Sequence, residues 1–108
     1  MSAVTTHVLD TARGRPAQDV PVRLERADGR VVAEAVTDTD GRISDLGPQE
    51  IPAGTYRLVF GTAAYFEGTG QHGFFPEVTI TFAITDPTQH HHVPLLLSPY
   101  GYSTYRGS

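Results

Sequence analysis

The sequence predicts an all-β protein, a small antiparallel β-sandwich, and two features indicate this class. Apolar residues recur at every second position far more often than at the 3.6-residue period of a helix, which is typical of strands with one buried face. Eleven glycines and eight prolines divide the 108 residues into short segments, as turns between strands require. We expect seven or eight strands in a single domain over residues 1–108, with a modest core that association between subunits would enlarge.

The individual strands follow from their alternation and from the turns beside them. Residues 78–84 (VTITFAI) have the clearest one-face pattern. Residues 20–25 and 31–36 flank Asp28-Gly29, which predicts a hairpin. Residues 55–60 (TYRLVF) lie between Pro-Ala-Gly and a further glycine, and so form another strand. The remaining strands are expected at residues 4–10, 89–98 and 100–106.

One short helix is expected over residues 62–68 (TAAYFEG). This segment lacks alternation and ends in Gly68, a residue that commonly follows the last turn of a helix.

Composition excludes several classes of function. The chain has no cysteine, which removes disulfides, thiolate metal sites and cysteine nucleophiles, and it has no lysine, which removes Schiff-base chemistry. A net charge of −4 without a basic cluster argues against nucleic acid. The longest strongly apolar run, residues 93–97, is far too short to span a membrane, and the first residues do not resemble a signal peptide. We expect a soluble cytoplasmic protein.

Three adjacent histidines begin the strand near the C-terminus. Strand geometry places His90 and His92 on one face and His91 on the opposite face with three apolar residues. Histidines at the start of a strand are commonly solvated, and we expect this of His90 and His91. A zinc site formed by His90, His92 and a third ligand such as His7 is chemically possible, but no acidic residue at ligand spacing supports it, and we expect no metal.

Two further features of the C-terminal region point to contacts. Leu96 lies on the same face as His92, while Leu95 and Leu97 point the other way, so this strand is apolar on both faces. We expect another subunit to cover the second face, near His92. The last nine residues hold three of the five tyrosines, which fits either a simple edge strand or a docked C-terminus that presents Ser108.

The segment HHHVPLLLSPYGYSTYRGS resembles the C-terminal signature of the 5-hydroxyisourate hydrolases, the transthyretin-related family of urate breakdown, whose chains end in Tyr-Arg-Gly-Ser. One departure is visible, because the family usually has His-Tyr-His where this chain has His91 in the middle. That residue points away from His92, so we expect the catalytic face to be unaffected. The resemblance extends over nearly the whole chain, through THVLDTARGRPA at 6–17, TDGR at 39–42, GTY at 54–56, YF at 65–66 and FPE at 75–77.

The resemblance implies a transthyretin-like (prealbumin-like) sandwich that assembles as a homotetramer, a dimer of dimers with active sites in the channel between dimers. It implies cofactor-free hydrolysis of the N1–C6 amide of a small-molecule substrate, 5-hydroxyisourate, to 2-oxo-4-hydroxy-4-carboxy-5-ureidoimidazoline. The residues carried over as catalytic are His7, Arg42, His92 and Ser108, and those carried over as substrate-binding are Arg42, Tyr105, Arg106 and Gly107.

Side-chain chemistry agrees with these roles. An imidazole suits the deprotonation of water near neutral pH, and either His7 or His92 can be the base. Arg42 can stabilise a developing oxyanion, although Asp-Gly-Arg on pattern alone is an ordinary turn with a solvated arginine, as Asp28-Gly29-Arg30 illustrates. A transthyretin-like carrier that binds a small molecule without turnover, and a purely structural sandwich, remain the alternatives.

Overall fold

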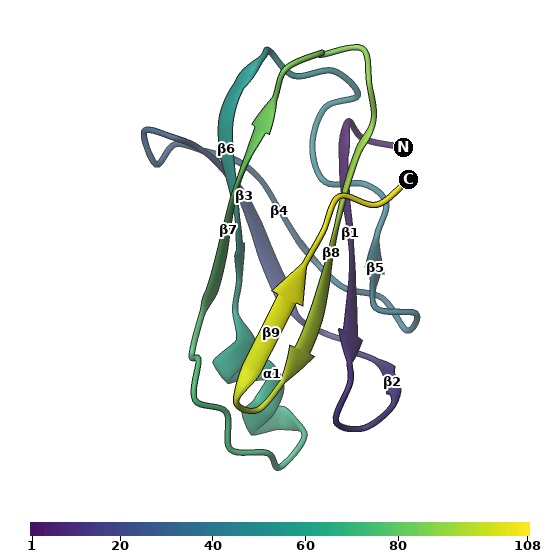
Figure 1. Ribbon diagram of the computed structural model, residues 1–108, viewed down its shortest axis with the longest axis vertical. Coiled ribbons are helices and arrows are strands. Elements are labelled where there is room, and N and C mark those ends of the chain that lie inside the picture. Colours follow the sequence, from purple (N-terminus) through teal and green to yellow (C-terminus); the bar gives the residue numbers. More distant parts are fainter.

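The computed structural model describes residues 1–108 and shows two β-sheets packed face to face, with one helix at an end of the sandwich (Figure 1). The bounds of the strands and the helix are β1 Val4–Asp10, β2 Arg15–Pro16, β3 Pro21–Arg26, β4 Val31–Val36, β5 Arg42–Ile43, β6 Gly54–Phe60, α1 Thr62–Gly68, β7 Val78–Ile84, β8 His91–Ser98 and β9 Gly101–Thr104.

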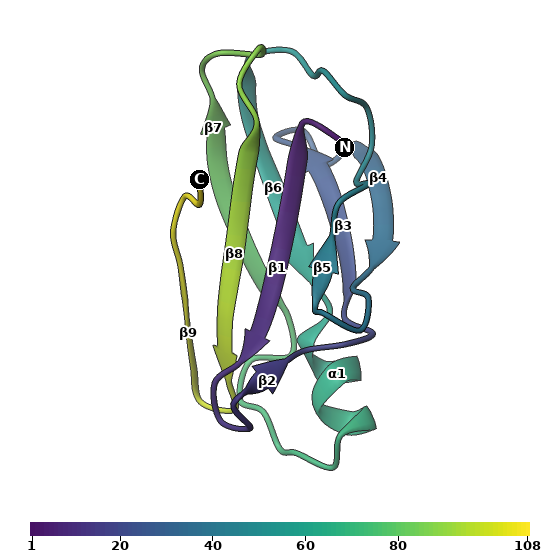
Figure 2. The same cartoon turned by 90° about the vertical axis from the view of Figure 1, so that its right-hand side faces the viewer.

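The nine strands divide into two sheets. The first, which we call the β1 sheet, has the order β2-β1-β8-β9, with β5 also paired to β1. The second, the β3 sheet, has the order β4-β3-β6-β7. Figure 2 shows the β1 sheet from its outer side, with β1 and β8 at its centre and the short strands β2 and β5 beside β1.

The predicted β-sandwich is confirmed, with two differences in detail. The central pair β1 and β8 is parallel rather than antiparallel, with Val4 opposite His91 and Asp10 opposite Leu97. Parallel neighbours need a long connection, and here the whole β3 sheet lies between them in the chain. There are nine strands rather than seven or eight, because β2 and β5 have two residues each, which is too short to show alternation in a sequence.

The core fills the space between the two sheets. Alternate residues of the strands point inward and are almost fully buried. The apolar residues at every second position of the sequence are therefore the ones that face the core. The predicted hairpin is confirmed by the antiparallel pair β3 and β4. The largest fully buried side chains are Phe60, Leu24, Leu46, Leu58, Leu95 and Leu97.

The helix α1 occupies the predicted residues and covers one end of the core. Its Tyr65 and Phe66 are buried, and the residues on its outward-facing side are exposed. It has seven residues, and the protein contains no helix with the length and apolar character needed to cross a membrane.

The prediction that His91 is solvated is wrong. The side chain is only 4% exposed, and its Nδ1–H donates a hydrogen bond to the Gln89 carbonyl oxygen over 3.0 Å. Its position on β8 explains the burial, since His91 alternates in step with the inward-facing Val93 and Leu95. His90 precedes the strand and is exposed, as expected.

Candidate active site

The outer face of the β1 sheet brings together three side chains that are far apart in the sequence. In the register of the sheet, Thr5 of β1 lies opposite His92 of β8, and His7 lies opposite Pro94. On its other edge, β1 places His7 opposite Arg42 of β5. Residues opposite each other in a sheet point to the same side, so His7, Arg42 and His92 share one face.

The backbone of a neighbouring loop fixes the ring of His7. Its Nε2 lies 2.8 Å from the carbonyl oxygen of Asp40. A carbonyl oxygen only accepts, so Nε2 must carry the proton and donate it. The neutral ring therefore keeps its lone pair on Nδ1, which is the nitrogen that can act as a base.

Arg42 follows a tight turn held by the carboxylate of Asp38. Asp38 Oδ1 accepts hydrogen bonds from the backbone N–H groups of Asp40 and Arg42, each over 2.9 Å. Gly41 has a φ of +74°, and its carbonyl oxygen accepts a hydrogen bond from Val8 over 2.7 Å, which joins the turn to β1. The side chain of Arg42 is exposed and forms no salt bridge, since the one salt bridge of the chain joins Arg23 and Glu25. Its guanidinium is free to bind a ligand.

His92 lies half-buried beside these groups. Its Nδ1 is 2.8 Å from the hydroxyl oxygen of Thr5. Burial lowers the pKa of His92 below 6.5, and the positive charges of Arg42, His90 and His7 lower this pKa further. A lowered pKa keeps the ring neutral at pH 7, which is the form that can take a proton from water.

The C-terminal segment packs against His92. The backbone N–H of Gly107 donates to the carbonyl oxygen of His92 over 2.8 Å, in an isolated antiparallel bridge. A Cβ atom at position 107 would lie 2.5 Å from Cδ2 of His92, so any other residue would have to displace the ring or the C-terminal segment. Ser108 follows directly and is exposed. The chain is therefore docked on β8 at Gly107, while β9 is an edge strand of the β1 sheet, so each of the two alternatives holds for a part of the C-terminal region.

Tyr105 and Arg106 lie at a different place in the single chain. Both line a cavity of about 300 Å³ at the edge of the sandwich, with residues of β7 and the inward-facing His91 and Val93. Arg106 Nη2 donates to the side-chain oxygen of Gln89 and to the carbonyl oxygen of His90, over 3.2 and 3.4 Å. These bonds hold Arg106 beside the start of β8 rather than beside His7 and Arg42.

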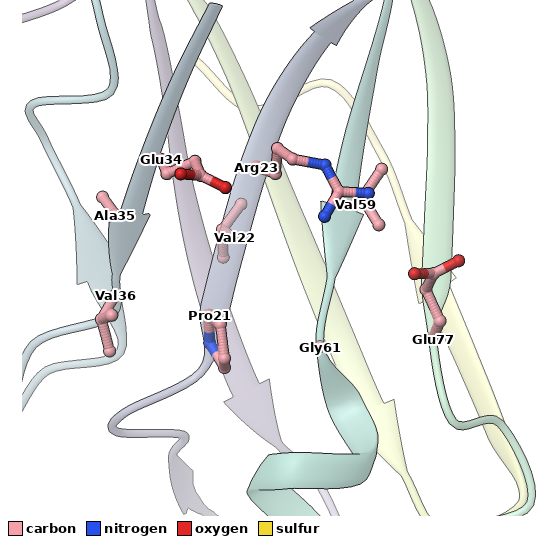
Figure 3. A pocket seen from close by; sticks show the side chains of 9 residues that line it. All are labelled: Pro21, Val22, Arg23, Glu34, Ala35, Val36, Val59, Gly61 and Glu77. Carbon is pink, nitrogen blue, oxygen red and sulfur yellow. The ribbon is translucent and has the colours of Figure 1, made fainter. Parts of the chain in front are cut away.

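The histidine and arginine face is open in the single chain. None of the five main cavities is lined by His7, Arg42 or His92. The cavity in Figure 3, about 380 Å³, lies on the outer face of the β3 sheet, where Arg23 is already paired with Glu25. No histidine lines this cavity. No three histidine, cysteine or acidic side chains lie together in a way that would hold a metal ion.

Sequence reasoning missed two parts of this face, the Thr5 hydroxyl and the Asp38 carboxylate. Thr5 stands two residues before His7, so strand alternation alone would have placed both side chains on the same face. Asp38 stands before a glycine turn, where an aspartate side chain commonly accepts backbone hydrogen bonds. No local pattern could have shown that Thr5 reaches His92, because that contact joins residues 87 positions apart.

Comparisons with known proteins agree with this geometry. The model of the HIUase/Transthyretin family matches residues 4–107. The 5-hydroxyisourate hydrolase of Mus musculus is 48% identical over 99% of this chain and 96% of its own length. The structure of Klebsiella pneumoniae 5-hydroxyisourate hydrolase superposes with a TM-score of 0.90 at 42% identity, covering 100% of this chain and 94% of that chain. Sea bream transthyretin in complex with thyroxine gives a TM-score of 0.89 at 33% identity, covering 97% and 94%. This chain belongs to the HIUase/Transthyretin family.

Proposed function

We propose that this protein is a 5-hydroxyisourate hydrolase of urate breakdown, and that it acts in the cytoplasm. The observation that carries the proposal is the shared face of His7, Arg42 and His92, which places two imidazoles next to a guanidinium that forms no salt bridge. The substrate is inferred from the relatives named as 5-hydroxyisourate hydrolases, which are similar to this chain over nearly its full length. The reaction opens the N1–C6 amide by addition of water and gives 2-oxo-4-hydroxy-4-carboxy-5-ureidoimidazoline.

The two histidines divide the proton transfers. One removes a proton from water as the water attacks the amide carbon, and the other donates a proton to the leaving nitrogen. Such general acid and base catalysis contributes about 10²- to 10⁴-fold. His7 offers Nδ1 as its basic nitrogen, because its Nε2–H is bound to Asp40. His92 has its Nδ1 turned to Thr5, which leaves Nε2 for the reacting groups.

Arg42 supplies positive charge where negative charge develops. Its planar guanidinium can donate two hydrogen bonds to the carbonyl oxygen of the substrate as that oxygen becomes an oxyanion. Loss of one such donor typically costs about 2.7–4 kcal/mol of transition-state stabilisation. Ser108 extends beyond Gly107, which packs on His92, and its hydroxyl is our candidate for holding the water or the substrate. The reaction written in this way needs no cofactor and no metal.

We infer that the active protein is a homotetramer, a dimer of dimers. The site face carries half-buried Leu9 and Leu96 beside the polar residues and is open in one chain, so another subunit is the natural cover. The fold resembles that of transthyretin, and the resemblance of the sequence to this family implies a channel between dimers. In the tetramer we place Tyr105 and Arg106, together with Gly107, near the substrate at the subunit boundary. Light scattering on the purified protein tests the tetramer directly.

The likeness to a thyroxine complex of transthyretin favours one alternative, a carrier that binds in the same place without turnover. The two functions differ in what the histidines do. A carrier would lose a little affinity when His7 or His92 is replaced, whereas the hydrolase would lose catalysis.

The deciding experiment generates 5-hydroxyisourate from urate with urate oxidase and follows its ultraviolet decay with and without the protein. We expect faster decay that survives EDTA. Arg42→Gln should abolish most of it, and Arg30→Gln is the matched control, because Arg30 follows the equivalent Asp-Gly turn on the other sheet. Decay at the uncatalysed rate from a verified tetramer would contradict the hydrolase proposal.

The position of the affinity tag tests the role of Ser108. A tag after Ser108 should reduce the activity strongly, because it removes the terminal carboxylate and adds bulk next to His92. A tag before Met1 should leave the activity largely intact. Equal activities of the two tagged proteins would argue against a role for Ser108.

A further inference from the structure

The hydroxyl of Thr5 joins two histidines that lie on the same side of β8. Thr5 Oγ1 is 2.8 Å from Nδ1 of His92 and 2.9 Å from Nε2 of His90. The two rings are nearly parallel, with an interplanar angle of 20° and centroids 6.3 Å apart. Thr5 itself is 5% exposed, so water has little access to its hydroxyl.

The Thr5 hydroxyl has only one proton, so it can donate a hydrogen bond to only one of the two histidines and must accept one from the other. If His90 donates its Nε2–H to Thr5, the Thr5 hydroxyl donates to Nδ1 of His92, and the neutral His92 then carries its proton on Nε2. If Thr5 instead donates to Nε2 of His90, His92 must donate its Nδ1–H to Thr5, and its Nε2 is then a free base. The protonation of His90 is thereby coupled to the state of His92.

We propose that Thr5 is a positioning residue whose hydroxyl orients His92 and relays protons between its Nδ1 and the exposed His90. The catalytic use of this relay rests on the hydrolase function proposed above. In the base state, Nε2 of His92 accepts a proton from the attacking water. Its Nδ1–H passes to Thr5 Oγ1, and the Thr5 hydroxyl proton passes to Nε2 of His90. One proton enters the chain, one arrives at its far end, and a hydroxide is left to attack the substrate.

The charges around His92 explain why a relay is useful. The groups that face its ring are His7 from β1, Arg42 from β5 and His90 just before β8. Gly107 packs on the ring, and the terminal carboxylate lies one residue beyond. Burial and these positive groups lower the pKa of His92 and oppose a charge on it. His90 is exposed, so water stabilises the positive charge better there.

Three variants test the proposal in the hydrolase assay. Thr5→Val keeps the branched shape and strand preference but removes the hydroxyl. It should lower kcat/KM roughly 10- to 100-fold, less than the about 10²- to 10⁴-fold of a complete acid or base catalyst, because His92 itself remains. Thr5→Ser should restore most of the activity. Thr6→Val is the matched control, because the Thr6 hydroxyl also bonds from β1 to β8, at Val93, but on the inner face. It should cost stability without changing the catalysis.

Rates in mixtures of H₂O and D₂O separate a relay from a structural role. Several protons moving together give a curved dependence of kcat on the deuterium fraction, and Thr5→Val should make it linear. His90→Gln can still hydrogen-bond Thr5 but cannot accept the relayed proton, so it should lower kcat with little change in KM. A linear dependence in the unaltered protein, or full activity of Thr5→Val, would overturn the relay.

Nitrogen NMR of the histidine rings tests the bridge without any turnover. In the unaltered protein the titrations of His90 and His92 should be coupled, and Thr5→Val should uncouple them while Thr6→Val should not. An unchanged His92 titration in Thr5→Val would overturn the proposal even if the protein hydrolyses 5-hydroxyisourate. Uncoupling in a protein without hydrolase activity would support the bridge and reject the function instead.

Discussion

Gly107 lies so close to the imidazole of His92 that a Cβ atom at position 107 would stand 2.5 Å from Cδ2 and 3.3 Å from Cγ of the ring. The same residue donates its backbone N–H to the carbonyl oxygen of His92. The C-terminal segment thus packs on one side of the His92 ring, and Thr5 binds Nδ1 on another side of the same ring. Both contacts limit the directions in which Nε2 can point.

Gly107→Ala should therefore damage catalysis more than folding. The added methyl group must displace either the ring of His92 or the C-terminal segment, and a displacement of about 1 Å at a reacting group can cost 10²-fold in rate. We expect kcat/KM for 5-hydroxyisourate to fall by about that factor. Gly68→Ala is the control, since a Cβ there meets nothing within 4 Å. Equal activities of the two variants would show that the packing of Gly107 does not matter.

Gly41→Ala tests the turn that carries Arg42. Gly41 has a φ of +74°, and a Cβ atom would lie 2.3 Å from the backbone oxygen of Val8, which cannot move out of the sheet. Gly29→Ala is a close control, because Gly29 has a φ of +89° but open space around it. The control should lose about 1–2 kcal/mol of unfolding free energy from backbone strain. Gly41→Ala should lose more and should also lose hydrolase activity, as measured by denaturant unfolding and the decay assay.

The lowered pKa of His92 predicts the pH dependence of the activity. With His92 as the base, its neutral form is the active one, so kcat/KM should fall on the acid side with an apparent pKa below 6.5. Removal of a nearby positive charge in Arg42→Gln should raise this pKa and move the remaining acid limb to higher pH. An acid limb centred above pH 6.5 in the unaltered protein would contradict the assignment of His92 as the base.

The same shift has a consequence for stability with a definite sign. The folded-state pKa of His92 is lower than the unfolded one, so the unfolded chain binds the proton first as the pH falls. Unfolding free energy should decrease as the pH falls from above 6.5 toward the folded-state pKa, and this contribution should be constant below it.

The features of this site that depend on neighbouring residues in the sequence could be predicted, whereas contacts between residues far apart in the sequence could not. Alternation within β8 placed His92 and His91 on opposite faces, and the absence of alternation placed the helix at 62–68, because both are local properties. The prediction that His91 is solvated was wrong because it relied on the typical exposure of histidines. His91 lies on the same face of the strand as Leu95, and that face is buried. The parallel pairing of β1 with β8, and with it the contact of Thr5 with His92, has no local signal.

The two Asp-Gly-Arg turns look alike in the sequence but differ in their surroundings in the fold. In sequence, Asp28-Gly29-Arg30 and Asp40-Gly41-Arg42 are equivalent, and only the family resemblance distinguished Arg42. In the fold, Gly29 stands in open space, whereas Gly41 is pressed against Val8 beside His7. Tertiary packing thus separates a plain turn from one that presents a functional arginine.

The buried carboxylate of Asp10 gives a prediction about stability alone. It accepts hydrogen bonds from the hydroxyl of Tyr65 over 2.6 Å, from the backbone N–H of Arg13 over 2.9 Å and from the side chain of Gln71 over 3.1 Å. Burial raises the pKa of Asp10, but these bonds outweigh it and leave the pKa below 3.8. Burial and the bond to Asp10 in turn raise the pKa of Tyr65 to about 12.

Tyr65→Phe should lower the unfolding free energy by about 1–3 kcal/mol at pH 7, because it removes one donor from a buried charged acceptor. Since the folded-state pKa of Asp10 is lowered, the stabilisation by its charge is present above pH 3.8 and is lost as the pH falls through that lowered pKa. The deficit of Tyr65→Phe should therefore shrink in acid. Urea unfolding at fixed protein concentration measures it, with the exposed Tyr100→Phe as the control. A deficit that stays constant into acid would mean that Tyr65 acts through packing and not through the charge of Asp10.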